Sequence, residues 1–83
     1  MGKATILLVD DDEITLNIVD ELLRREGYTI LTANTVQTGL ETLQRQSVDL
    51  ILLDVVLPDG DGITMCRQIK ADLRTAQIPI ILV

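Results

Sequence analysis

Three aspartates directly follow short apolar segments of the chain. Asp10 and Asp11 follow residues 5–9 (TILLV), and Asp54 follows residues 50–53 (LILL). If these segments are neighbouring parallel strands, the three carboxylates meet at the carboxyl edge of the sheet, where open α/β folds bind ligands. Clustered carboxylates resist ionisation unless a cation joins them. A few oxygen ligands with room for water suit Mg²⁺, so the sequence predicts a magnesium site.

The position of Asp54 also predicts a nucleophile. A carboxylate can attack phosphorus and form an aspartyl phosphate. Phosphoryl transfer depends mainly on positioning and on neutralising the charge of the oxygens, which a bound Mg²⁺ supplies. An aspartate directly after four aliphatic residues is costly to desolvate without a compensating partner. Asp54 is therefore the candidate nucleophile, and Asp10 and Asp11 are candidate metal ligands.

The elements that would position these residues alternate between strand and helix. Strands are expected at residues 5–9, 28–33, 50–53 and 78–83. The segment 50–53 is apolar throughout, which is typical of a parallel strand buried on both faces. The order βαβαβαβ predicts a single α/β domain with a parallel sheet and helices on both faces.

Three helices are expected between these strands. Asp12 is a good N-cap for a first helix over residues 13–26, and Gly27 suits its C-terminal end. The apolar face of this helix is predicted from a spacing of three and four residues: Ile14, Ile18, Val19, Leu22 and Leu23. Asn34 or Thr35 is expected to cap the second helix, whose inward residues are Val36, Leu40 and Leu43. The inward residues expected of the third helix are Ile63, Met65, Cys66, Ile69 and Leu73. Pro58, Gly60 and Gly62 predict a loop before the third helix.

The composition excludes several classes of site and partner. The 83 residues carry seven basic and 13 acidic side chains, a net charge of −6, which disfavours direct binding to nucleic acid. The sequence contains no histidine, so a histidine base or histidine-ligated zinc is excluded within these residues. The single Cys66 cannot form an internal disulfide. No targeting or membrane-spanning segment is visible, and a cytoplasmic location is expected.

Four motifs together resemble the receiver domain of two-component response regulators, and their spacing agrees along the whole chain. They are residues 7–12 (LLVDDD), 50–58 (LILLDVVLP), 61–62 (DG) and 78–80 (IPI). The resemblance implies a flavodoxin-like, doubly wound sheet with strand order 2-1-3-4-5 in the full family. That order places the first and third strands side by side.

The resemblance also implies a role for each matching residue. Asp54 is the implied phosphoacceptor. Asp11 is the implied direct Mg²⁺ ligand, Asp10 belongs to the same acidic pair and acts partly through water, and the backbone carbonyl of Val56 completes the implied ligand set. The phosphoryl donor would be a sensor histidine kinase or a phosphotransfer protein, and an effector of unknown identity would respond. Such a domain is a signalling phosphoacceptor rather than an enzyme, because it catalyses only its own phosphorylation and dephosphorylation.

The resemblance ends before the last part of the family pattern. The family has five βα units, whereas residues 1–83 supply three units and one further strand, without the last strand and the last two helices. We therefore expect an incomplete receiver domain from a longer gene product. The hydroxyl residue after strand four and the lysine after strand five lie outside this sequence. An uncovered strand at residues 80–83 would favour dimer formation or strand exchange.

Two alternatives remain open at this point. In a haloacid-dehalogenase-like phosphatase fragment, Asp10 would be the nucleophile and Asp12 the acid/base, but Asp54 and the Pro58 loop would then have no role. A receiver-like interaction module that is never phosphorylated is the second alternative. Asp59 and Asp61 flank glycines and are expected to be solvated turn residues.

Overall fold

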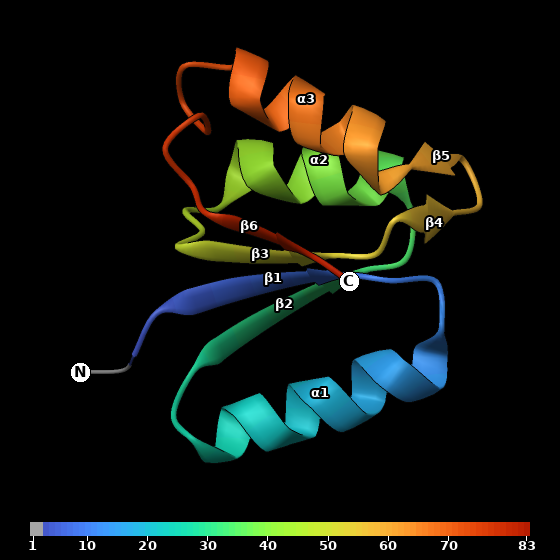
Figure 1. Ribbon diagram of the computed structural model, residues 1–83. Coiled ribbons are helices and arrows are strands. Elements are labelled where there is room, and N and C mark those ends of the chain that lie inside the picture. Colours follow the sequence, from blue (N-terminus) through green and yellow to red (C-terminus); the bar gives the residue numbers. More distant parts are fainter. Residues whose placement is uncertain (1–2) are drawn as a thin grey trace.

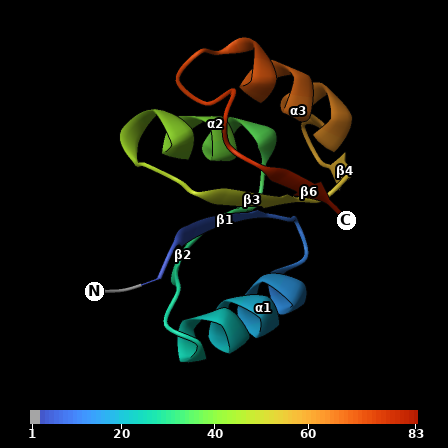
Figure 2. The same cartoon turned by 60° about the vertical axis from the view of Figure 1, so that its left-hand side comes forward.

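A four-stranded parallel sheet with helices on both faces forms the core of the computed structural model, which describes residues 3–83 (Figure 1). The elements are β1 (Thr5–Val9), α1 (Glu13–Arg25), β2 (Thr29–Ala33), α2 (Val36–Arg45), β3 (Leu50–Leu53), β4 (Val56–Leu57), β5 (Gly60–Asp61), α3 (Gly62–Ala71) and β6 (Ile80–Leu82). The strand order is β2-β1-β3-β6, so β1 and β3 are neighbours. α1 covers one face, and α2 and α3 cover the other (Figure 2). The predicted α/β class is confirmed.

Alternating side chains of β1 build two separate cores, because successive strand residues point to opposite faces. Ile6 and Leu8 pack toward α1, whereas Leu7 and Val9 pack on the side of α2 and α3. The larger core contains most of the fully buried side chains: Leu7, Val9, Ile51, Leu53, Met65 and Ile69. Both central strands are therefore held from two sides, which makes their carboxyl ends rigid supports for a site.

The predicted core-facing side of α1 is partly wrong. Ile14, Ile18 and Leu22 are 70%, 53% and 55% exposed, whereas Leu16 is buried and Val19 packs beside it against the sheet. A helix contacts a sheet along one side, and that side is the one that carries Leu16 and Val19. The three exposed residues form an apolar row along the outside of α1, called the α1 ridge below.

The ends of α1 follow the sequence prediction. Asp12 is the N-cap: its Oδ1 accepts a hydrogen bond from the Ile14 amide at 3.1 Å and its Oδ2 accepts one from the Thr15 hydroxyl at 2.8 Å. These bonds lower the pKa of Asp12, and the bond from Thr15 has the largest effect. Gly27 has a φ of 95°, the left-handed conformation that favours glycine after a helix.

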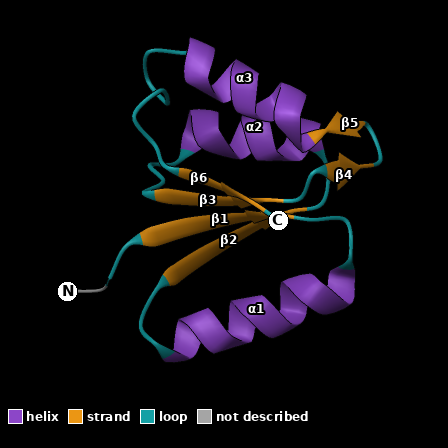
Figure 3. Ribbon diagram, in the orientation of Figure 1, coloured by secondary structure: helices purple, strands orange, loops and turns teal. Residues whose placement is uncertain are grey.

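Other elements are shorter than expected or were missed. The strands predicted at residues 28–33 and 78–83 are limited to Thr29–Ala33 and Ile80–Leu82. The segment predicted as a loop contains the antiparallel hairpin β4–β5, in which Val56 pairs with Asp61 and Leu57 pairs with Gly60. This hairpin extends beyond the carboxyl ends of the sheet strands (Figure 3).

Leu73 was expected on the inner side of the third helix, and this prediction is wrong. α3 ends at Ala71, and the chain becomes extended at Asp72. The buried Thr75 hydroxyl donates a hydrogen bond to the Ile69 carbonyl at 2.6 Å, which ties the following turn to the last turn of the helix. Leu73 lies in this turn and is exposed.

Candidate functional site

Sheet hydrogen bonds hold the two candidate strand ends next to each other. Val9 and Leu53 are paired at the carboxyl ends of β1 and β3. The Asp10 amide donates to the Ala33 carbonyl at 3.0 Å, and the Asp54 amide donates to the Val9 carbonyl at 2.8 Å. The backbones of both aspartates are therefore extensions of the ladder rather than parts of a free loop.

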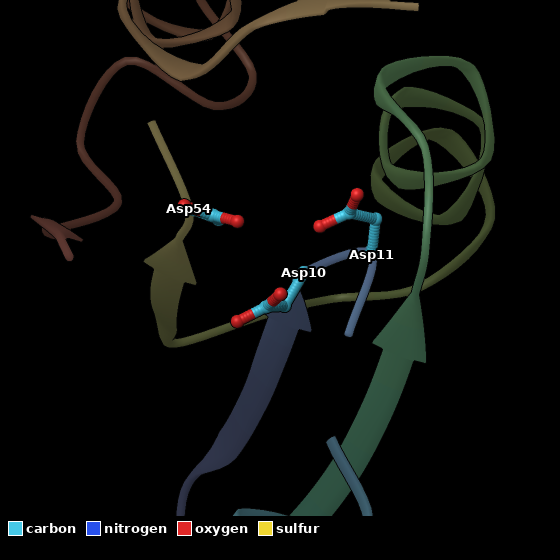
Figure 4. Close-up of side chains that lie close together, drawn as sticks. All are labelled: Asp10, Asp11 and Asp54. Atoms are coloured by element: carbon cyan, nitrogen blue, oxygen red, sulfur yellow. The ribbon is translucent and has the colours of Figure 1, made fainter. Parts of the chain in front are cut away.

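The three aspartates lie together at this edge. Asp10, Asp11 and Asp54 each offer a carboxylate oxygen, and these oxygens are all within 4.8 Å of one another. The side chains of Asp11 and Asp54 point toward one another across the gap, and Asp10 lies beside them at the end of β1 (Figure 4). Asp10 and Asp54 are half-buried, whereas Asp11 is exposed.

The electrostatics of this cluster fit a divalent cation. Partial burial raises the pKa of the Asp10 carboxyl, and the negative charges of Asp54 and Asp11 raise it further. The Asp12 amide, which donates to Asp10 Oδ1 at 2.9 Å, opposes this effect only in part. The donors are all carboxylate oxygens, the kind of ligand that Mg²⁺ prefers. The residues present therefore fit a Mg²⁺ ion.

Replacing Asp10 by asparagine is expected to have opposite effects on the metal-free and the metal-bound chain. One of three repelling charges is removed, so the chain in EDTA should unfold at a higher temperature than the wild type. The same change should weaken Mg²⁺ binding by about tenfold. Thermal unfolding in EDTA and across a Mg²⁺ titration measures both effects, because an ion that binds only the folded chain raises its stability. A variant that is less stable in EDTA and gains as much from Mg²⁺ would contradict this account.

Val56 places backbone groups beside the candidate nucleophile. Its amide lies 3.3 Å from Asp54 Oδ1 and donates to it, and its side chain is 73% exposed. The segment around Val55 is also fixed by the first residue of α3, because the Gly62 amide donates a hydrogen bond to the Val55 carbonyl at 2.7 Å. Gly62 itself has no room for a side chain: an added Cβ would meet the Asp54 carbonyl oxygen and lie 3.0 Å from Val55 Cα.

Asp59 and Asp61 are exposed, as expected. Both side chains also accept hydrogen bonds from backbone amides at the beginning of a helix, which was not predicted from the sequence. Asp61 is the N-cap of α3: its Oδ1 accepts from the Thr64 amide at 2.7 Å. The local pattern Asp-Gly-Ile-Thr could have indicated this cap. Asp59 instead accepts hydrogen bonds from Val36 and Gln37, at the beginning of α2. No local pattern links residues so far apart in the sequence.

The phosphatase alternative loses support from the geometry. It requires Asp12 as an acid/base, yet both carboxylate oxygens of Asp12 accept hydrogen bonds within the first turn of α1. It also leaves Asp54 without a role, although Asp54 completes the cluster. Within residues 3–83, none of the helices combines the length and the apolar character needed to cross a membrane.

Known proteins share both the sequence pattern and the fold. Residues 6–83 match the family of response regulator receiver domains. The chain is 41% identical over 81 residues to the response regulator PleD of Caulobacter vibrioides, and 42% identical over 78 residues to the transcriptional regulatory protein AfsQ1 of Streptomyces coelicolor. These alignments cover 98% and 94% of this chain, but only 18% of PleD and 33% of AfsQ1.

The fold is also shared with a solved receiver-domain structure. The receiver domain of the sensor histidine kinase PA1611 from Pseudomonas aeruginosa is 32% identical, with a TM-score of 0.91 over 99% of this chain and 66% of that one. That structure has a magnesium ion coordinated in its active-site cleft. The strand order β2-β1-β3-β6 and the acidic cluster at its carboxyl edge agree with this likeness. The chain belongs to the response regulator receiver domain family.

Proposed function

We propose that this chain accepts a phosphoryl group on Asp54, with Mg²⁺ held by Asp10, Asp11, Asp54 and the backbone carbonyl of Val56. The observation that carries the proposal is the position of the Asp54 carboxylate, at the end of a buried central strand and within 4.8 Å of the acidic pair. The phosphoryl donor is a sensor histidine kinase or a phosphotransfer protein, and a cytoplasmic location follows from this role.

In this reaction a carboxylate oxygen of Asp54 attacks the phosphorus of a phosphohistidine. The new oxygen–phosphorus bond replaces the phosphorus–nitrogen bond, whose electron pair returns to the imidazole. The Val56 amide orients the carboxylate through Oδ1, and the sheet bond from the Asp54 amide to Val9 fixes its backbone. A Mg²⁺ ion held by the acidic cluster and the Val56 carbonyl would neutralise the charge of the transferred oxygens.

The proposed role is that of a signalling phosphoacceptor that catalyses only its own phosphorylation and dephosphorylation. The new charge on Asp54 would alter a surface that a separate effector recognises. The acidic excess of the chain makes direct nucleic-acid binding by this segment unfavourable. Incubation with acetyl phosphate tests the proposal: one phosphoryl group should be added in Mg²⁺ and none in EDTA. An equal gain of mass in EDTA would contradict the proposed metal site.

The α1 ridge is the proposed docking surface for the phosphoryl donor. Ile14, Ile18 and Leu22 form an exposed apolar row. The row begins at Ile14, two residues after Asp12, which is itself the neighbour of the acidic pair. A donor helix lying along the row would therefore reach the cluster. Exposed apolar rows of this kind mark protein-interaction surfaces.

Replacing Ile18 by glutamate is expected to slow transfer from a histidine kinase by about tenfold or more, since losing a central anchor of an interface costs about 2 kcal/mol and about 1.4 kcal/mol corresponds to tenfold. Phosphorylation by acetyl phosphate should not change, because the cluster itself is intact. Transfer is measured with purified histidine kinases, using the one that reacts fastest with the wild type. Asn17→Glu adds the same charge beside the ridge and serves as the control. Equal transfer to Ile18→Glu and to the wild type would exclude the ridge as the docking surface.

A further inference from the structure

The tip of the β4–β5 hairpin is fastened to the beginning of α2. Asp59 lies in the two-residue turn of this hairpin, and its Oδ1 accepts a hydrogen bond from the Val36 amide at 2.8 Å. Its Oδ2 accepts one from the Gln37 amide at 3.1 Å. These amides have no partner within the helix, and the helix dipole favours a negative charge at this end. The bonds, led by the one from Val36, lower the pKa of Asp59, so the carboxylate is ionised at neutral pH.

The base of the same hairpin borders the candidate metal site. β4 begins at Val56, whose amide donates to Asp54 Oδ1 and whose carbonyl is a proposed Mg²⁺ ligand. β4 and β5 contain two residues each, and a hairpin this short is marginally stable without external support. Leu57 is buried, the Gly62 amide holds the base through the Val55 carbonyl, and Asp59 holds the tip. The bonds of Asp59 to α2 therefore contribute to fixing the hairpin that carries the Val56 carbonyl.

We propose that Asp59 is a positioning residue for the metal site: by joining the hairpin tip to α2, it holds the Val56 carbonyl where Mg²⁺ requires it. This inference rests on the proposed function only in taking that carbonyl as a ligand. Coupling between two sites is reciprocal. Mg²⁺ binding should therefore also strengthen the two hydrogen bonds from α2 to Asp59.

The chain contains a matched control at the opposite edge of the sheet. Asp49 Oδ2 accepts a hydrogen bond from the Thr5 amide at 2.8 Å. Like Asp59, Asp49 is an exposed aspartate that joins two segments distant in the sequence through backbone amides. Asp49→Ala therefore removes a comparable link without touching the hairpin.

The first test is a direct Mg²⁺ titration. Binding is measured by calorimetry and by the NMR signals of the backbone amides in the cluster. Asp59→Ala should raise the half-saturating Mg²⁺ concentration by about fivefold or more. Asp59→Asn keeps one neutral acceptor oxygen and should show a smaller increase, and Asp49→Ala should match the wild type. Circular dichroism checks that each variant is folded. If Asp59→Ala does not fold, the comparison of Asp59→Asn with Asp49→Ala replaces it.

The second test is amide hydrogen exchange. In the wild type, Mg²⁺ should slow exchange at Val36 and Gln37, and this response should disappear in Asp59→Ala. Unchanged half-saturation in both Asp59 variants, or exchange at these amides that ignores Mg²⁺ in the wild type, would overturn the inference. Neither outcome would argue against the proposal that Asp54 is phosphorylated. Conversely, a wild-type chain that binds Mg²⁺ but accepts no phosphoryl group would contradict the proposed function and leave both tests of Asp59 valid.

Discussion

Replacing Asp54 by asparagine is expected to abolish phosphorylation of the chain completely and to leave its fold intact. The amide is neutral and cannot act as the attacking carboxylate. Asparagine has the same shape, and its side-chain oxygen can still accept the hydrogen bond that the Val56 amide donates to Asp54 Oδ1. Intact mass after incubation with acetyl phosphate and Mg²⁺ measures the phosphoryl group, and circular dichroism measures the fold.

The control for this prediction is Asp49→Asn. It changes an aspartate in the same conservative way at the opposite edge of the sheet, where the partner of the side chain is the Thr5 amide. This variant should be phosphorylated like the wild type. A folded Asp54→Asn chain that still gains one Mg²⁺-dependent phosphoryl group would mean that another residue is the acceptor.

Replacing Gly62 by alanine is expected to disturb both the fold and the phosphoacceptor. The added Cβ would be closer to the Asp54 carbonyl oxygen than real Cβ atoms come to any neighbour, and 3.0 Å from the Asp54 carbonyl carbon and from Val55 Cα. These neighbours are backbone atoms and cannot rotate away. Overpacking of this kind costs about 1–3 kcal/mol, so the urea midpoint should fall and phosphorylation should slow.

Gly60→Ala is the matched control for Gly62→Ala, because both glycines belong to the same hairpin region. A Cβ at Gly60 would meet only Val36 Cγ2, at 3.4 Å, the end of a side chain. This variant should unfold close to the wild-type midpoint. If the two alanine variants were equally stable, the close packing of α3 against the acceptor backbone would not be the feature that requires glycine.

The central strands and the acidic cluster could be predicted from the sequence because local signals coincide there. The apolar runs at residues 5–9 and 50–53 are short and end in aspartates, and both form strands with those bounds. Alternation of strands and helices predicts a parallel sheet, and parallel strands end at the same edge. Asp10, Asp11 and Asp54 lie together at that edge as a consequence.

The side of α1 that packs against the sheet could not be decided from spacing alone. Two apolar rows satisfy the helical period, one through Ile14 and Ile18 and the other through Leu16 and Val19. The choice depends on which row fits the side chains that β1 and β2 present, and this is a property of the assembled sheet. The row through Ile14 stays on the surface, where we propose that it binds the phosphoryl donor.

The role of Asp59 was missed for a related reason. Its partners, Val36 and Gln37, are 23 and 22 residues away in the sequence. Capping rules compare a residue with the helix that follows it directly, so they identify Asp12 but not a cap that reaches from another loop. Contacts of this kind appear only when the hairpin and α2 are brought together.

Locating the phosphoryl group in the wild-type chain is the most direct test of the central claim. The chain is incubated with acetyl phosphate in Mg²⁺ or in EDTA, digested, and sequenced by mass spectrometry. The account predicts one phosphoryl group, on Asp54 and only in Mg²⁺. A phosphoryl group on Asp10 would contradict it and favour the phosphatase-like chemistry. The account would also be contradicted if the folded wild-type chain bound Mg²⁺ and gained no phosphoryl group.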